Sequence, residues 1–353
     1  MTVTTPTTAA GAKIDAPTLR APRSTTRWQF VTLAVVAAVG VALPFILPPA
    51  EMAIAMRVVI FAIMGIGWNM MSGFGGMFSF GHAAYFGIGA YVTAILLVDF
   101  GLSPWIGLVA GMVVAAAAGV GISYLALRYK LTGAYYALST FAFAEMLRLF
   151  VVGNDALNGT IGFTLPVLRG DDWAMFQFPA GSPYYFWIGI GMLVAALAVV
   201  ILFLRSRTGR FTQASRDDDL AAAAIGVDVL RYKLTTVAIS AAITAAAGTL
   251  YLQYYMFVDP ELAFGANVSN NAIITAVVGG VATVWGPLVG AIVVAPLSDI
   301  VAAFLRHPPE WLSFIEGHGG LDILIYAIIL IACVLLLPRG IYGTIKHWAE
   351  KKK

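Results

Sequence analysis

The sequence predicts an all-α protein, a polytopic transmembrane helical bundle of about ten spans with both termini in the cytoplasm. Of its 353 residues, 60% are hydrophobic and only 11% are charged, whereas a soluble domain contains about 25% charged residues. Apolar runs of about 20 residues, the length that crosses a bilayer as a helix, recur along the chain. Because these runs are continuous, they exclude a β-barrel, whose strands alternate apolar and polar residues. The composition also excludes an ordinary soluble enzyme and an intrinsically disordered chain.

The chain divides into a polar N-terminal tail, a transmembrane domain and a basic C-terminal tail. Residues 1–28 are rich in Thr, Ala and Pro, and no signal-peptide cleavage site follows them, so we expect a flexible cytoplasmic tail. The transmembrane domain covers residues 29–340, and residues 341–353 form the C-terminal tail. The predicted spans are residues 29–48, 52–71, 77–98, 103–127, 133–152, 185–204, 233–255, 269–285, 286–305 and 321–338. The pair between 269 and 305 is either two full crossings or a broken or re-entrant pair.

The distribution of positive charge predicts the orientation. With ten spans and a cytoplasmic N-terminus, 17 of the 21 Lys and Arg residues fall on the cytoplasmic side. The opposite side contains only Arg169 and Arg306. Because cytoplasmic loops near span ends carry an excess of Lys and Arg, this asymmetry supports both the number of spans and their direction.

The motifs of soluble catalysis are missing from the sequence. It contains no GxxxxGK[ST] loop for nucleotide phosphates, no HExxH zinc motif and no GxSxG nucleophile motif. Its four histidines have no ligand spacing, and its single cysteine, Cys333, can form no disulfide within the chain. We therefore expect no enzymatic activity, no metal site and no cofactor in this chain.

Ionisable residues inside the predicted spans are few, namely Arg57, Glu145, Arg148, Asp299 and Asp322. A proton-coupled carrier usually has a string of such groups along its pathway. Glu145 and Arg148 are three residues apart and face each other on one helix. They form either a self-neutralising ion pair or a contact for a substrate.

Uncharged polar and small residues also occur within the spans. The glycine-rich segment 73–91 either lets helices pack closely or borders a cavity, where irregular backbone is tolerated. His82, within this segment, is either a hydrogen-bonded packing residue or a ligand-binding residue. The candidates for a translocation path are Asn69, Ser79, His82, Thr140, Asn270, Asn271 and Thr275.

Two loops are long enough to contact other proteins. The outer loop, residues 153–184, contains the sequence NGTIGF, in which Asn158, Gly159 and Gly162 suit a tight turn because Asn and Gly tolerate positive φ. This turn is either purely structural or part of a docking or gating surface. The cytoplasmic loop, residues 205–232, is a long polar stretch on the other side of the membrane.

The cytoplasmic loop predicts one short helix. Ser215 and Asp218 resemble a capping box, and the helix dipole favours the acidic residues 217–219 in the first turn. Good helix formers follow them, and Gly226 supplies a C-terminal stop. The predicted helix has about ten residues and is roughly 15 Å long.

Basic residues flank this helix, with Arg231 and Lys233 on its C-terminal side, and we expect them to anchor both ends at the membrane surface. One interpretation is a solvated connecting helix without a partner. The other is a knob that inserts into a groove on a cytoplasmic motor protein, where Asp219 meets an Arg or Lys of that protein.

Five segments resemble, in order, the permease subunits of branched-chain amino acid ABC importers, and the M-type subunit most closely. They are GFGGMFSFGHAAYFGIGAY at 73–91, TGAYYALSTFAFAEMLRLF at 132–150, SRDDDLAAAAIGVDVLRYKLTTVAIS at 215–240, VVGGVATVWGPLVGA at 277–291 and LPRGIYG at 337–343. The sequence departs from the family at Asp219, where the family tends to carry Glu, and at Ala282, where a glycine is common.

The resemblance implies a permease of the bacterial inner membrane that moves branched-chain or related amino acids by alternating access. The implied partners are a homologous second permease, two cytoplasmic ATPase subunits that bind ATP and Mg²⁺, a periplasmic substrate-binding protein and the lipid bilayer, but no nucleic acid. The alternatives are a urea or short-amide permease of the ABC type and a motor-independent secondary transporter. The residues implied to couple to the ATPase are Arg216, Asp217, Asp218, Asp219, Gly226, Arg231 and Lys233.

Overall fold

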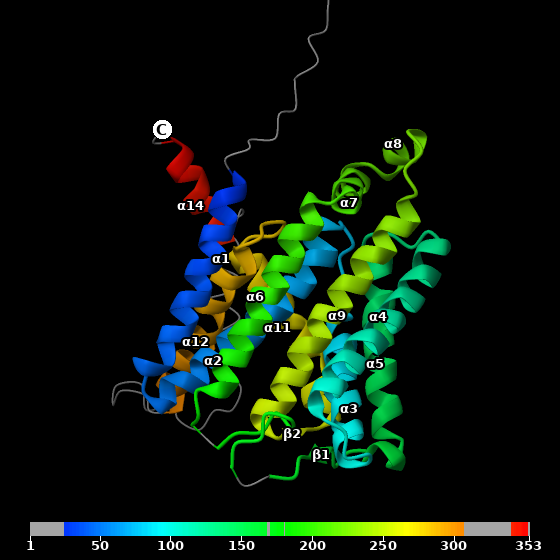
Figure 1. Ribbon diagram of the computed structural model, residues 1–353. Helices are drawn as coiled ribbons and strands as arrows, with labels where there is room; N and C mark the ends of the chain where they lie inside the picture. Colours follow the sequence, from blue (N-terminus) through cyan, green and yellow to red (C-terminus); the bar gives the residue numbers. More distant parts are fainter. Residues whose placement is uncertain (1–24, 168–169, 180, 307–339, 352–353) are drawn as a thin grey trace, which may run out of the picture.

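The structure is a computed structural model that describes residues 25–167, 170–179, 181–306 and 340–351. Long helices lie side by side and connect the two ends of the molecule (Figure 1). The helices are α1 (Thr25–Ala42), α2 (Pro49–Trp68), α3 (His82–Val98), α4 (Pro104–Arg128), α5 (Ala134–Val152), α6 (Tyr184–Arg205), α7 (Arg207–Asp217), α8 (Asp219–Ala224), α9 (Val229–Tyr255), α10 (Pro260–Phe264), α11 (Ala266–Gly279), α12 (Gly286–Arg306) and α14 (Gly340–Lys351). Two short strands, β1 (Phe163–Thr164) and β2 (Phe257–Val258), pair in antiparallel fashion. The predicted all-α polytopic bundle is therefore confirmed.

The helices correspond closely to the predicted spans. In the described residues, seven helical stretches are long and apolar enough to cross a membrane, and two shorter apolar helices, His82–Val98 and Gly286–Ser298, accompany them. They match in order the predicted spans from 29–48 to 286–305. The predicted span 321–338 lies outside the described residues, so the total number of spans stays a prediction.

Successive long helices run in alternating directions between the two ends (Figure 1). The helices α7, α8 and α14 lie at the same end as the start of α1, whereas the β1–β2 pair lies at the opposite end. The predicted cytoplasmic loop is therefore at the same end as the described parts of the two predicted cytoplasmic tails. We call this the predicted cytoplasmic end.

We expect cysteines placed at Asp171 and Ala214 to react with membrane-impermeant thiol reagents from opposite sides of the membrane. Both native side chains are exposed, whereas neighbouring Thr212 is fully buried, at 0% exposed, and would label poorly. The measurement compares Asp171→Cys and Ala214→Cys, each combined with Cys333→Ser, in intact and in permeabilised cells. Labelling of both cysteines from the same side would contradict the odd number of crossings between them.

The structure corrects the predicted start of the third span, because residues 77–81 are not helical. α2 continues into a π-helix over Asn69–Phe74, and regular structure resumes only at His82. Glycines in this stretch favour irregular backbone, and neighbouring side chains satisfy its polar groups. The Trp68 indole N–H, for example, donates to the Ser79 carbonyl at 2.8 Å. Irregular backbone is tolerated at membrane depth where protein buries it in this way.

A turn at residues 280–285 separates α11 from α12. Gly280 has a φ of 131° and Ala282 a φ of 58°, and both values favour glycine. Asn69 holds this turn from across the bundle: its side-chain oxygen accepts from the Ala282 N–H and its side-chain nitrogen donates to the Thr283 carbonyl, each at 2.8 Å. The segment 269–305 therefore forms two helices joined by a turn, and Ala282 adopts a backbone conformation that a glycine would adopt without strain.

α9 lies at the centre of the bundle, where it packs against α2, α3 and α4. Small residues make this packing possible. A Cβ atom at Gly89 of α3 would overlap the Ala245 carbonyl of α9, and a Cβ at Gly248 of α9 would overlap the Phe86 carbonyl of α3. At Gly89, the glycine-rich segment therefore serves close helix packing, which is how small residues associate membrane helices.

Candidate functional site

The cytoplasmic loop folds into two helices, α7 and α8, instead of the single predicted helix. Asp218 lies between them in extended backbone, and its Oδ1 accepts from the N–H groups of Leu220 at 2.8 Å and Ala221 at 3.0 Å. The predicted capping role of Ser215 is wrong, because its hydroxyl donates to a carbonyl inside α7. An Asp cap satisfies two otherwise unpaired donors, so the chain starts a new helix there.

α8 ends at Ala224, and Gly226 supplies the C-terminal stop that the sequence predicts. Gly226 has a φ of 85°. Its N–H donates to the Ala223 carbonyl at 3.0 Å, and the Val227 N–H donates to the Ala222 carbonyl at 3.1 Å, which is the Schellman arrangement. A Cβ at Gly226 would meet nothing within 4 Å, so only the backbone conformation favours glycine at this position.

Two basic residues fasten this segment to the membrane domain. Lys233 of α9 is only 8% exposed, and its ammonium pairs with the Asp219 carboxylate at 2.5 Å. Arg216 of α7 donates to the Gly73 carbonyl at 3.3 Å and pairs with Asp217 at 2.9 Å. Asp219 therefore has an ion-pair partner within the chain, because α9 brings Lys233 beside the start of α8. Its contact with a partner protein stays a prediction.

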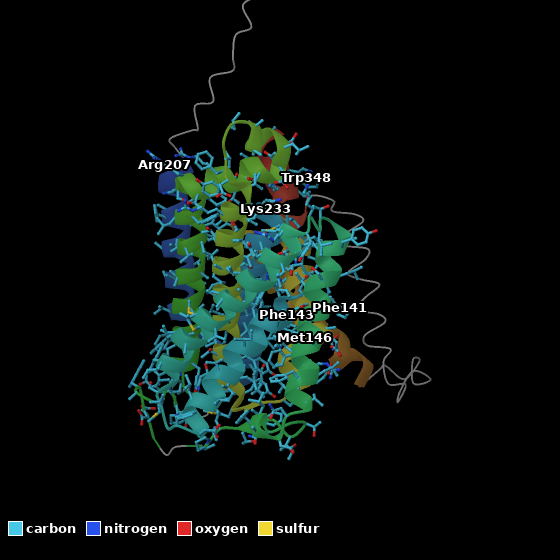
Figure 2. All side chains as sticks on the ribbon, turned by 90° about the vertical axis from the view of Figure 1, so that its right-hand side faces the viewer. Phe141, Phe143, Met146, Arg207, Lys233 and Trp348 are labelled. Carbon is cyan, nitrogen blue, oxygen red and sulfur yellow. The ribbon has the colours of Figure 1, made fainter. Side chains whose placement is uncertain are left out.

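Two large apolar side chains are exposed to solvent at α8, one in the helix and one at its C-cap residue, Ile225. Leu220 is 84% exposed and Ile225 is 78% exposed, whereas Ala222 between them is buried at 3%. Arg231, in the first turn of α9, is also exposed. Figure 2 shows Lys233 just below this region, at the predicted cytoplasmic end. A held helix with an exposed apolar tip suits insertion into a groove of another protein.

Most of the predicted translocation-path residues are buried among the helices, and their role in transport stays a prediction. His82 Nε2 lies 3.0 Å from the Ser240 hydroxyl, and the Thr140 hydroxyl accepts from a backbone N–H of the 75–81 stretch at 3.2 Å. Asn270 is exposed, and of the predicted set only Asn271 lines the large cavity described next. The remaining members are at most 2% exposed: Asn69, Ser79, His82, Thr140 and Thr275.

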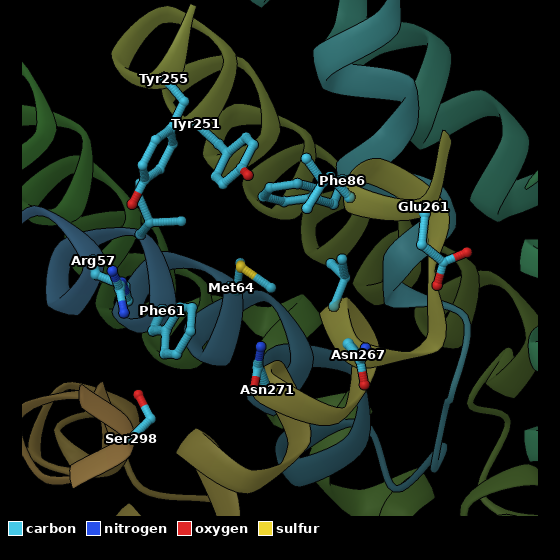
Figure 3. A pocket seen from close by; sticks show the side chains of 13 residues that line it. Arg57, Phe61, Met64, Phe86, Tyr251, Tyr255, Glu261, Asn267, Asn271 and Ser298 are labelled. Atoms are coloured by element: carbon cyan, nitrogen blue, oxygen red, sulfur yellow. The ribbon is translucent and has the colours of Figure 1, made fainter. Parts of the chain in front are cut away.

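A cavity of about 500 Å³ lies between α2, α3, α9, α10, α11 and α12 (Figure 3). One wall is a row of aromatic rings, in which the ring centroids of Phe86 and Tyr251 are 5.5 Å apart and those of Tyr251 and Tyr255 are 4.5 Å apart. Asn267 and Asn271 line the cavity from α11. This combination of apolar walls and a few polar groups is typical of a site for a small molecule.

Opposite charges stand on opposite sides of this cavity, Arg57 on one side and Glu261 on the other (Figure 3). Arg148 lies 3.3 Å from the Glu261 carboxylate and 2.5 Å from that of Glu145. The two residues singled out in the sequence, Glu145 and Arg148, thus belong to a network of three charges. This network carries one net negative charge at the edge of the cavity.

Sequence reasoning singled out Arg57 and Asn271 but missed the aromatic wall. Phe86, Tyr251 and Tyr255 are ordinary residues of membrane helices, and they come together only when α3 packs on α9. The one signal in the sequence is the i, i+4 spacing of the two tyrosines, which places them on the same face of a helix.

The outer loop forms the predicted turn. Asn158, Gly159 and Gly162 have φ values of 58°, 44° and 76°. A Cβ at Gly162 would overlap the Val258 carbonyl, so glycine is needed where β1 and β2 approach each other. Ile161, at the tip, is 81% exposed. The turn has a structural role, and its role in docking stays a prediction.

Residues 52–333 match the family model described as branched-chain amino acid transport system / permease component. Over 287 residues the chain is 29% identical to the high-affinity branched-chain amino acid transport system permease protein LivM of Salmonella typhimurium, covering 75% of this chain and 67% of that protein. It is 29% identical over 297 residues to LivM of Escherichia coli K12, covering 78% and 69% of the two chains. It is 28% identical over 296 residues to LivH of the same organism, covering 80% and 91%. No solved structure matches the chain.

The match to the family model begins in α2 and runs through α12, so it includes both the α7–α8 segment and the cavity. Together with the apolar helices, it identifies a multi-pass protein of the inner membrane. The chain belongs to the family of permease components of branched-chain amino acid transport systems.

Proposed function

We propose that this chain is the permease subunit of an ABC importer, which moves branched-chain or related amino acids into the cell by alternating access. The observation that carries the proposal is the apolar tip of α8, exposed at the predicted cytoplasmic end on a helix whose two ends are fixed by Asp218 and Gly226. The names of the relatives, permease proteins of high-affinity branched-chain amino acid transport systems, support the substrate class.

The proposed complex contains four further protein subunits. A homologous second permease completes the pore, in line with the two kinds of permease, LivM and LivH, to which this chain is similar. Two cytoplasmic ATPase subunits bind ATP and Mg²⁺, since the sequence contains no GxxxxGK[ST] loop. A periplasmic binding protein delivers the amino acid to the outer loop. This chain itself catalyses no reaction.

The contacts of the α7–α8 segment provide two routes by which a movement of α8 could be transmitted to the transmembrane helices. One runs through Asp219 to Lys233, and therefore to the central helix α9. The other runs through Arg216 to the carbonyl of Gly73 in the π-helix. Interruptions of this kind within a helix occur frequently at functional sites. A shift of α8 would thus reach both the centre of the bundle and the irregular stretch before α3.

The π-helix connects this route to the turn between α11 and α12. Asn69, at its first position, hydrogen-bonds Ala282 and Thr283 of that turn. Arg216 also packs against Gly76, whose φ is 70° and whose Cβ position lies 2.6 Å from the Arg216 Cγ. ATP binding changes transport only if it stabilises one arrangement of these contacts more than the other.

The proposal is tested by Leu220→Ser. Burying a leucine side chain contributes about 1.5–3 kcal/mol, so we expect association with the ATPase subunits to weaken by about tenfold or more. The abundance of the permease should not change, because Leu220 is 84% exposed in the permease alone. The measurement is the amount of ATPase that co-purifies with the tagged permease.

The matched control is Ile161→Ser, which removes an apolar side chain of similar exposure, 81%, from the outer loop at the opposite end of the bundle. This variant should retain normal ATPase association. If Leu220→Ser and Ile161→Ser both retain wild-type association, α8 is only a connector and the coupling function is wrong.

A further inference from the structure

We propose that the cavity shown in Figure 3 holds the transported molecule as a zwitterionic α-amino acid with an apolar side chain, and that Arg57 binds its carboxylate. This inference rests on the proposed import of amino acids and assigns the site that recognises them within the membrane domain.

The size and walls of the cavity fit such a ligand. Its volume of about 500 Å³ lies in the range of about 300–1,000 Å³ that is typical of small-molecule sites. Met64 and Phe86, both 2% exposed, form part of its wall, and Phe61 lies beside Arg57 (Figure 3). An apolar side chain of the ligand would therefore contact thioether and aromatic groups, whereas a polar side chain would lose hydrogen bonds to water.

The charges of the cavity fit the two ends of a zwitterion. An arginine in a membrane-spanning helix is costly and marks a functional site by default, and a guanidinium group matches a carboxylate in shape and charge. Across the cavity, Glu261 belongs to the network with one net negative charge. The carboxylate of the ligand therefore points toward Arg57 and its ammonium toward Glu261, on the other side of the cavity.

Two amide side chains complete the site. Neither Asn267 nor Asn271 has a side-chain hydrogen-bond partner among the described residues, although both line the cavity. The Ser298 hydroxyl donates to the Ala295 carbonyl at 2.7 Å, and its oxygen can still accept a hydrogen bond from a ligand. These groups supply donors and acceptors that the fold itself does not use, and a polar ligand would satisfy them.

The test measures the charge preference of a cysteine placed in the cavity. Ser298 stands on the same side as Arg57 (Figure 3), and Ser298→Cys is combined with Cys333→Ser in the assembled transporter in lipid nanodiscs. We expect an anionic methanethiosulfonate to react faster than a cationic one, and Arg57→Gln to reduce this rate ratio by about tenfold, which corresponds to about 1.4 kcal/mol. Leucine should slow the reaction, whereas leucinamide, which has no carboxylate, should not.

The controls separate an effect on the site from an effect on folding. Ala214→Cys, on α7, should show the same rate ratio with and without Arg57→Gln. Arg57→Lys should retain the preference for the anionic reagent. Asn271→Leu should retain that preference but weaken the protection by leucine. If Arg57→Gln does not accumulate in the membrane, Asn271→Leu is the variant that tests the assignment.

A rate ratio at Ser298→Cys that is independent of Arg57, or equal protection by leucine and leucinamide, would overturn the assignment. If either result is obtained while the ATPase subunits remain bound, the cavity assignment is wrong but the proposed importer is not. A permease that binds no ATPase subunits would instead count against the proposed importer.

Discussion

Gly89→Val is expected to abolish the folded permease. Gly89 lies in α3, where a Cβ atom would overlap the carbonyl oxygen of Ala245 in the central helix α9. Because the obstacle is helix backbone, it cannot rotate away as a side chain would. Separating the helices would also break the hydrogen bond from the Thr249 hydroxyl to the Gly89 carbonyl, at 3.1 Å. Overpacking costs about 1–3 kcal/mol where a core can adjust, and we expect a larger loss of stability here.

The measurement is the yield of monodisperse permease after detergent extraction, together with its thermal unfolding midpoint. Gly191→Val is the matched control, since Gly191 is also a helical glycine, in α6, but its Cβ would meet nothing within 4 Å. That variant should behave like the wild type. Similar yields and midpoints for the two variants would show that α3 and α9 do not pack as described.

Gly226→Val is expected to uncouple the permease from the ATPase without affecting its insertion or abundance. The backbone at Gly226 has a φ of 85°, a left-handed conformation that costs an ordinary residue roughly 1–2 kcal/mol and is a genuine outlier for a β-branched one. α8 has only six residues, so it cannot absorb this strain and its end should rearrange. Co-purification of the ATPase should fall by about tenfold, and hydrolysis should no longer respond to the loaded binding protein.

Gly226→Asn separates the effect of backbone strain from the effect of adding a side chain at this position. Asn adopts the left-handed conformation far more readily than Val, and a side chain here meets nothing within 4 Å. We therefore expect Gly226→Asn to retain most of the coupling. If it loses as much coupling as Gly226→Val, the helix stop is not the reason for glycine at this position.

Hydropathy predicted the helices well but not the interruptions between them. A buried irregular segment is as apolar as a helix, so the stretch 77–81 was assigned to a span although the structure begins α3 at His82. The signal for irregular backbone was the run of glycines, which equally suits close helix packing. The structure shows both uses, since Gly89 packs on α9 and Gly76 has a φ of 70°.

Local chemistry predicted part of the candidate sites. The stop at Gly226 depends on a few neighbouring residues, and it was predicted correctly. The partner of Asp219 is Lys233, 14 residues away, and depends on where α9 begins, so the sequence did not reveal it. The cavity combines residues of six helices, and of these residues only Arg57 and Asn271 stand out in the sequence.

Uptake of labelled leucine into proteoliposomes is the most direct test of the central claim that this permease transports amino acids by coupling to an ATPase. The proteoliposomes would contain the assembled transporter, with ATP inside and the binding protein outside. We expect uptake that requires both ATP hydrolysis and the binding protein, and that falls by about tenfold with Leu220→Ser. Leucine uptake at the same rate without ATPase subunits would contradict this claim and indicate a motor-independent secondary transporter.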